Sequence, residues 1–190
     1  MVPFKDLVEN PRVWQETAHD LICAANILFE AVQDTDHHRS GTRDRRPIVW
    51  CSLMMLYGLA AENLTKAIIV AKVARRETRA SPGLVDRSEG PLPNWFTTHN
   101  LVELARDRAG LTLSRSQKHL LKRLQEFVEC GKYPVGVREG QGRSTWVSLE
   151  PFDSNDTLQL LEYLENELQR ASNGFVVQAS DLRGIHREGT

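Results

Sequence analysis

The chain of 190 residues has almost no net charge, because 24 Lys and Arg residues stand against 25 Asp and Glu residues. A dedicated duplex-DNA-binding domain usually has a strong basic excess, so this class of protein is disfavoured. The chain has only three Cys residues and no Cys-x-x-Cys pair, which excludes a zinc ribbon and a thioredoxin-like motif. We therefore expect buried, reduced thiols at Cys23, Cys51 and Cys130, as in a cytoplasmic protein.

Targeting patterns and common catalytic motifs are missing as well. The chain has no P-loop, no Gly-x-Ser-x-Gly and no Rossmann glycine pattern. The first residues lack the basic start and the apolar stretch of a signal peptide. Residues 47–61 carry no charge, but Glu62 and Lys66 interrupt the run before it reaches the roughly 20 residues of a membrane-spanning helix. We therefore expect no membrane association. His19 and Cys23 share a helix face without an evident third ligand, so we also expect no metal and no cofactor.

What the chain does have is an ordinary globular composition, 41% hydrophobic, with helical periodicity. Asn10-Pro11 is typical of a helix start, and the apolar stripe that follows predicts a helix ending near Asp34. A second helix is predicted from about Pro47 to Arg79, and its first half is apolar on all sides, which is typical of the central helix of a bundle. The residues of the first stripe are Trp14, Ala18, Leu21, Ala25, Leu28 and Val32.

Two capping boxes follow the Pro- and Gly-containing loop at residues 80–93. Asn100 with Glu103 predicts the start of a short helix that Gly110 stops, and Ser114 with Gln117 predicts the start of the next helix. The apolar face of that helix consists of Leu120, Leu121, Leu124, Phe127 and Val128.

The remaining segments complete the predicted architecture. Residues 135–149 contain three Gly residues and favour a small β-hairpin. Ser154 or Asn155 should cap a last helix, with Leu158, Leu161, Leu164 and Leu168 on its apolar face. We predict one all-α domain, residues 1–174, built as a four- to five-helix up-and-down bundle around a long second helix, with a loosely attached tail at 175–190.

The near-zero net charge conceals strongly charged segments. Residues 37–46 contain four Arg residues and one Asp, and residues 72–79 contain four basic residues and one Glu. Residues 106–123 contain six basic residues and one Asp, whereas residues 150–167 contain six acidic residues and no basic one. Such a chain can bind a polyanion locally, although the charges can equally be solvated helix faces.

Three stretches stand out in order along the chain: residues 56–67 read Leu-Tyr-Gly-Leu-Ala-Ala-Glu-Asn-Leu-Thr-Lys-Ala, residues 99–104 read His-Asn-Leu-Val-Glu-Leu, and residues 132–134 read Lys-Tyr-Pro. In this order they resemble motifs of the HEPN (higher eukaryotes and prokaryotes nucleotide-binding) domain family. The first is similar to the family's small/aromatic run leading into Ala-Glu-x-x-x-Lys-Ala, and the second to its His-Asp/Asn-Leu-x-x-Leu helix start. The third stands where many members read Arg-Tyr-Pro. The resemblance covers residues 48–134, less than half of the chain.

The resemblance implies an RNA- or nucleotide-binding bundle in a prokaryotic defence or toxin–antitoxin system. It also implies a homodimer, with an antitoxin or a nucleotidyltransferase as partner. Some members of the family cleave RNA without a metal, using Arg-x(4–6)-His late in the bundle. Here the pair with that spacing is Arg12 and His19, which lies on the first helix and not late in the bundle. Arg115 and His119 lie in a more suitable region but are separated by only three residues, so catalysis is left open.

The candidate site follows from these residues. Glu62 and Lys66 are spaced for a helical ion pair, or they form with Asn63 a polar patch that faces a ligand. His99 either helps to start its helix or, beside that patch, is an acid–base group. The catalytic candidates are His119, Arg115 and His99, and the expected RNA or nucleotide contacts are Glu62, Asn63, Lys66, Lys132 and Tyr133. Three functions stay open: an RNA or nucleotide binder, a ribonuclease toxin, and a helical interaction or dimerisation module without a ligand.

Overall fold

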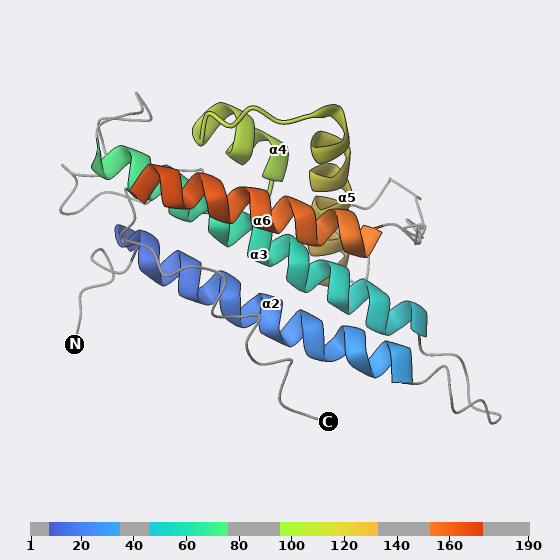
Figure 1. The fold of residues 1–190 in the computed structure, drawn as a ribbon. Helices are drawn as coiled ribbons and strands as arrows, with labels where there is room; N and C mark the ends of the chain where they lie inside the picture. The colour runs from blue at the N-terminus through green and yellow to red at the C-terminus, as the bar shows by residue number, and fades with distance from the viewer. Residues whose placement is uncertain (1–7, 35–45, 76–95, 133–152, 173–190) are drawn as a thin grey trace.

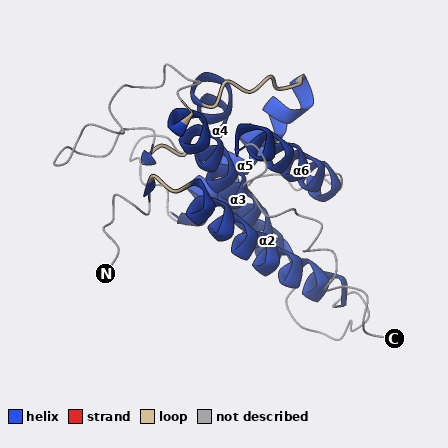
Figure 2. Cartoon of the chain, turned by 60° about the vertical axis from the view of Figure 1, so that its left-hand side comes forward, coloured by secondary structure: helices blue, strands red, loops and turns tan. Residues whose placement is uncertain are grey.

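The computed structural model describes residues 8–34, 46–75, 96–132 and 153–172, which form helices joined by short loops and contain no strand (Figures 1 and 2). Its elements are α2 (Pro11–Asp34), α3 (Arg46–Ala74), α4 (Leu101–Glu103), the π-helix η3 (Leu104–Arg108), α5 (Arg115–Lys132) and α6 (Asp153–Ser172). The all-α helical bundle is therefore confirmed. The predicted loop at 80–93, hairpin at 135–149 and tail at 175–190 lie outside the described residues.

Helix α3 is the centre of the bundle. Both views place it between α2 on one side and α4 and α5 on the other (Figures 1 and 2). Helix α2 runs antiparallel to α3, whereas α6 runs in the same direction as α3 (Figure 1). Accordingly, the Arg75 guanidinium just after α3 donates to the carbonyls of Arg170 and Ala171 at the end of α6, at 3.1 and 2.9 Å. The helices therefore do not simply alternate in direction along the chain.

The sequence of α3 explains its central position, because apolar residues surround the helix and need cover on every side. Residues Val49–Ala74 are long and apolar enough to cross a membrane, but 78% of their most apolar stretch is buried inside the fold, which fits a core helix. The helix ends at Ala74, before the predicted Arg79. Its fully buried members include Leu53, Met54, Leu64, Ile68 and Ile69.

A glycine permits the close packing of α5 on α3. A Cβ atom at Gly58 would lie 2.7 Å from Val128 Cγ2 and 2.9 Å from the carbonyl oxygen of Leu124. Both distances are shorter than a van der Waals contact, and the second involves backbone. Gly58 therefore sets how near α5 approaches α3.

Local hydrogen bonds begin the helices where the sequence predicts. The Arg12 amide donates to Asn10 Oδ1 at 3.0 Å before α2, and the Glu103 amide donates to Asn100 Oδ1 at 3.1 Å before α4. At α5 the capping box is reciprocal: the Gln117 amide donates to Ser114 Oγ at 3.1 Å, and the Ser114 amide donates to Gln117 Oε1 at 2.8 Å. Gly110 ends the short helical stretch with φ at +64°, a conformation that suits glycine.

Some details of the predicted core are wrong. Cys23 and Cys51 have exposed side chains, because they lie on the outward sides of α2 and α3. Leu158 is 44% exposed, whereas Leu160 takes the buried position on α6. Helix α6 also begins at Asp153, ahead of the predicted cap at Ser154 or Asn155. Neighbouring residues on a helix differ by 100° in direction, so a one- or two-residue displacement turns a side chain outward.

Tyr57 joins α3 to α2, and its buried phenol should cause a loss of stability at alkaline pH. Its hydroxyl donates to Asn26 Oδ1 at 2.9 Å, and burial raises the pKa of Tyr57 to about 12 from 10.0. Below pH 10 the phenol is protonated in both the folded and the unfolded state. Between pH 10 and 12 the unfolded state releases its proton first, so the free energy of unfolding falls.

We expect this residue to account for a loss of about 1.4 kcal/mol between pH 9 and pH 11. Urea denaturation of the wild type and Tyr57→Phe at both pH values measures it. The Phe variant should be less stable near neutrality by about 1 kcal/mol, the value of one hydrogen bond, but should show the smaller alkaline loss. Equal alkaline losses in the two proteins would contradict the assignment.

Candidate functional site

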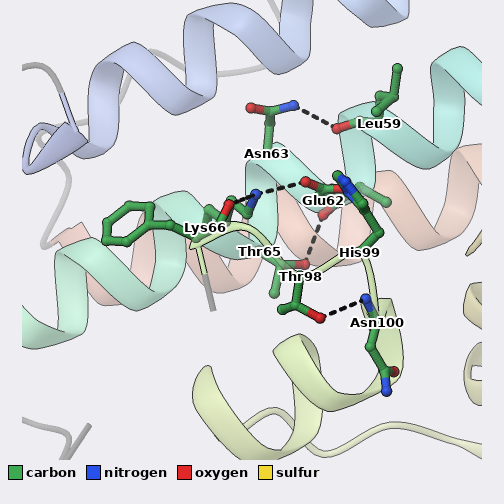
Figure 3. Close-up of polar contacts among 10 residues, drawn as sticks. Leu59, Glu62, Asn63, Thr65, Lys66, Thr98, His99 and Asn100 are labelled. Carbon is green, nitrogen blue, oxygen red and sulfur yellow. Dashed lines mark hydrogen bonds and ion pairs between the residues drawn. The ribbon is translucent and has the colours of Figure 1, made fainter. Parts of the chain in front are cut away.

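Two of the three motif stretches meet in space at a polar cluster of Glu62, Lys66 and His99. Lys66 Nζ donates to Glu62 Oε1 at 2.6 Å, and His99 Nδ1 lies 2.8 Å from Glu62 Oε2 (Figure 3). Glu62 and Lys66 occupy successive turns of α3, and His99 lies in the segment that leads into α4. The Glu62 carboxylate therefore bridges two groups that are far apart in sequence.

Lys66 is a buried cation whose ammonium group contacts a carboxylate, a backbone carbonyl and an aromatic ring of the protein. Its side chain is only 5% exposed. Besides Glu62, the ammonium group donates to the carbonyl of Phe96 at 2.8 Å and lies 5.3 Å from the centre of the Trp14 ring. A buried charge is tolerated when it is paired and hydrogen-bonded in this way. Lys66 therefore holds the segment before α4 against α3.

Trp14 and Phe96 form the apolar side of the cluster. Their ring centroids are 5.7 Å apart, and the Trp14 indole donates to the carbonyl of Val8 at 2.9 Å. The apolar stripe of the first helix predicts a core position for Trp14 and no part in the site. No spacing rule indicates the contact, because it joins α2 to residues more than 50 positions away.

His99 is the accessible member of the cluster, with 34% of its side chain exposed. Its position is fixed from both sides, because the Asn100 amide donates to Thr98 Oγ1 at 3.2 Å and Asn100 caps α4. The contact of Nδ1 with Glu62 Oε2 orients the ring, as an acid–base or ligand-binding histidine requires.

The other predicted site residues do not join this cluster. Asn63 donates from Nδ2 to the carbonyl of Leu59 at 2.7 Å, and its amide points away from the Glu62–His99 pair (Figure 3). Arg115 and His119 are exposed on the first two turns of α5. Lys132 is the last residue of α5, but its side chain and Tyr133 lie outside what the structure describes.

Helix α5 separates Arg115 and His119 from the cluster. It contacts α3 through Leu124 and Val128, next to Gly58. Arg115 precedes Leu124 by nine residues, which is about 13 Å along a helix. Figure 1 shows the start of α5 on the side turned away from α3. Arg115 and His119 therefore share a surface with each other and not with His99.

That surface is a row of four side chains, which we call the cationic stripe: Arg115, Lys118, His119 and Lys122. All four are exposed, and the structure gives none of them an ion pair within the described residues. The other basic groups of residues 106–123 are occupied or covered. Sequence reasoning singled out only Arg115 and His119, although the spacing i, i+3, i+4, i+7 would have indicated the whole stripe.

The basic side chains that have acidic partners are those of Arg106 and Arg108 in η3. Arg106 forms an ion pair with Asp107 at 2.6 Å, and this guanidinium lowers the pKa of the Asp107 carboxyl. Arg108 lies 3.7 Å from Glu103. Arg123 is 9% exposed. The predicted basic segment is therefore reduced, within the described residues, to the stripe.

A second His–Glu pair, which sequence reasoning missed, lies between α2 and α6. His19 Nε2 is 3.0 Å from Glu165 Oε1, and both side chains are mostly buried. The two residues are 146 positions apart, so no local pattern indicates the pair. Within the described residues no group of three or more His, Cys, Asp or Glu side chains is arranged to hold a metal ion.

Comparison with known proteins finds no matching family model, no matching curated protein and no matching solved structure. The class defined by fold and site is therefore an all-α bundle with a buried Glu–Lys pair that holds an accessible His.

Proposed function

We propose that this protein is a HEPN-like domain that binds RNA or a nucleotide, in the prokaryotic defence or toxin–antitoxin setting that the resemblance implies. One observation carries the proposal: Glu62 of the first motif stretch contacts His99 of the second at 2.8 Å. Residues 37 positions apart thus form one polar cluster, which supports a shared ligand site for the two motif stretches. The implied homodimer and the antitoxin or nucleotidyltransferase partner belong to the same proposal.

In this proposal the three residues have different tasks. His99 contacts the ligand, because it is the exposed member and its ring is oriented by Glu62. Glu62 and Lys66 position it, since both side chains are 5% exposed and have partners inside the protein. A Lys66 ammonium that bound a ligand phosphate directly would have to leave Glu62 and the Phe96 carbonyl.

The test is binding of labelled RNA and labelled ATP to the purified full chain at micromolar concentration, followed by fluorescence anisotropy. We expect salt-sensitive binding that His99→Gln weakens about tenfold, or about 1.4 kcal/mol. Gln keeps a polar group beside Glu62 and so limits any change in the fold. Circular dichroism checks that the variants keep their helix content.

The matched control is His19→Gln, which alters the other histidine held by a buried glutamate, at 3.0 Å from Glu165. Its affinity should equal that of the wild type. If neither RNA nor ATP binds the wild type, or if both variants lose affinity equally, the proposal fails.

A metal-independent ribonuclease is the second candidate. It is favoured by the exposed Arg115 and His119, which lie one turn apart on the same face of α5, where one phosphate can meet both. RNA recovered from the binding samples with a chelator present should then be shortened, and His119→Ala should leave it intact. RNA of full length from the wild type would exclude this candidate and keep the binding function.

A further inference from the structure

The cationic stripe has a geometry of its own. Arg115, Lys118, His119 and Lys122 lie at i, i+3, i+4 and i+7 of α5, and these positions share one helix face. The row is about 10 Å long at 1.5 Å per residue. Its direction is fixed, because Leu120, Leu121 and Leu124 on the opposite side of α5 are buried in the core.

The stripe does not serve the stability of α5. The first turn of the helix contains no acidic residue, and positive side chains near a helix start meet the positive end of the helix dipole. No described acidic residue forms an ion pair with the four side chains, whereas Arg12, Arg106 and Arg170 each have one with Glu16, Asp107 and Glu167. A basic row without ion-pair partners among the described residues creates a positive potential in the solvent beside it.

The residue types around the cationic stripe indicate what kind of partner it can bind. The large hydrophobic side chains exposed in the described residues are Ile27 on α2 and Leu158 on α6, so α5 lacks the apolar centre of a protein–protein interface. The only Phe, Tyr or Trp residue of α5, Phe127, is buried, so the described stripe offers no large aromatic ring to an unpaired base. Its four side chains offer charge and hydrogen-bond donors at fixed spacing, and the His119 ring and the Arg115 guanidinium are their only planar groups.

From these observations we infer that the cationic stripe binds the phosphate backbone of base-paired RNA, without reading its sequence. A row of about 10 Å extends beyond a single phosphate group and fits several successive phosphates of a strand. The regular backbone of a duplex presents them at constant spacing, and double-stranded RNA is recognised largely by such contacts. The inference rests on the proposed function, to which it adds a phosphate-binding surface apart from His99 and a class of nucleic acid.

The test uses the full chain and labelled RNA duplexes of about 20 base pairs in two unrelated sequences. A single strand, a DNA duplex and ATP are compared with them. Both RNA duplexes should bind equally and more tightly than the three comparison ligands. With three permanent charges, the slope of log K against log salt should be about −2.7 between about 50 and 200 mM salt.

The variant Arg115→Gln/Lys118→Gln/Lys122→Gln should bind more than about tenfold more weakly at the lowest salt, with a slope close to zero. Its control, Arg12→Gln/Arg106→Gln/Arg170→Gln, removes the same charge from exposed positions that are paired with acids. This control should bind within about twofold of the wild type.

Three results would overturn the inference. The two triple variants could weaken binding equally, the single strand could bind more tightly than the RNA duplexes, or the DNA duplex could bind as tightly as they do. The proposed function would survive these results, provided that His99→Gln still weakens binding. A wild type that binds no RNA or nucleotide at all would remove both.

Discussion

Lys66→Met should lower the free energy of unfolding by about 3–5 kcal/mol, because it leaves one partner of a buried ion pair behind. The change leaves the Glu62 carboxylate in an environment where its side chain is 5% exposed. It also removes the donor to the Phe96 carbonyl and the cation beside Trp14. The loss is measured by urea denaturation at neutral pH, followed by circular dichroism.

The surface pair Arg12–Glu16 provides a matched control, because it has the same four-residue spacing, at 2.8 Å, with side chains 67% and 60% exposed. Arg12→Met should cost less than about 1 kcal/mol. The double variant Glu62→Leu/Lys66→Met should recover most of the stability, since it buries no isolated charge. A double variant as unstable as Lys66→Met alone would contradict this account.

Gly58→Ala should cost about 2 kcal/mol of stability, although Ala is the better helix former by about 1 kcal/mol. The new methyl group would collide with Val128 Cγ2, which can move, and with the Leu124 carbonyl oxygen, which belongs to the backbone of α5. Thermal unfolding measures the loss. Adding Val128→Ala should restore only part of it, because the second collision stays.

Gly110 is the comparison for this prediction, since a Cβ atom there meets nothing within 4 Å but the residue has φ at +64°. Gly110→Asn should be better tolerated than Gly110→Ala, because Asn adopts this conformation more readily. At Gly58 the order should be reversed, with the larger Asn more harmful than Ala. The same order at both positions would show that space does not decide the effect at Gly58.

Local features of the fold follow from the sequence. The Asn100–Glu103 and Ser114–Gln117 boxes form because both partners lie within three residues of each other, and α3 is central because its residues are apolar on every side. The directions of the helices and the distances between them do not follow from the local sequence. They depend on contacts such as that of Gly58 with Leu124, which no local pattern contains.

The candidate site is predictable to the same extent. Glu62 with Lys66 is a local pair and forms as predicted, and its contact with His99 was one of two alternatives. The separation of His119 from that cluster could not be predicted, because it depends on η3 and Gly110, which turn the chain between α4 and α5. The helix pattern alone gives no position for such a turn in space.

The parallel course of α3 and α6 has a consequence for the dynamics of the bundle. Arg75 holds the last carbonyls of α6 from 95 and 96 positions away, so this docking closes a far longer chain loop than the pairing of α2 with α3. Contacts that close long loops have a higher entropic cost and form late in folding. In native-state hydrogen exchange, the α6 amides should therefore exchange through a partial opening in which α2 and α3 stay protected.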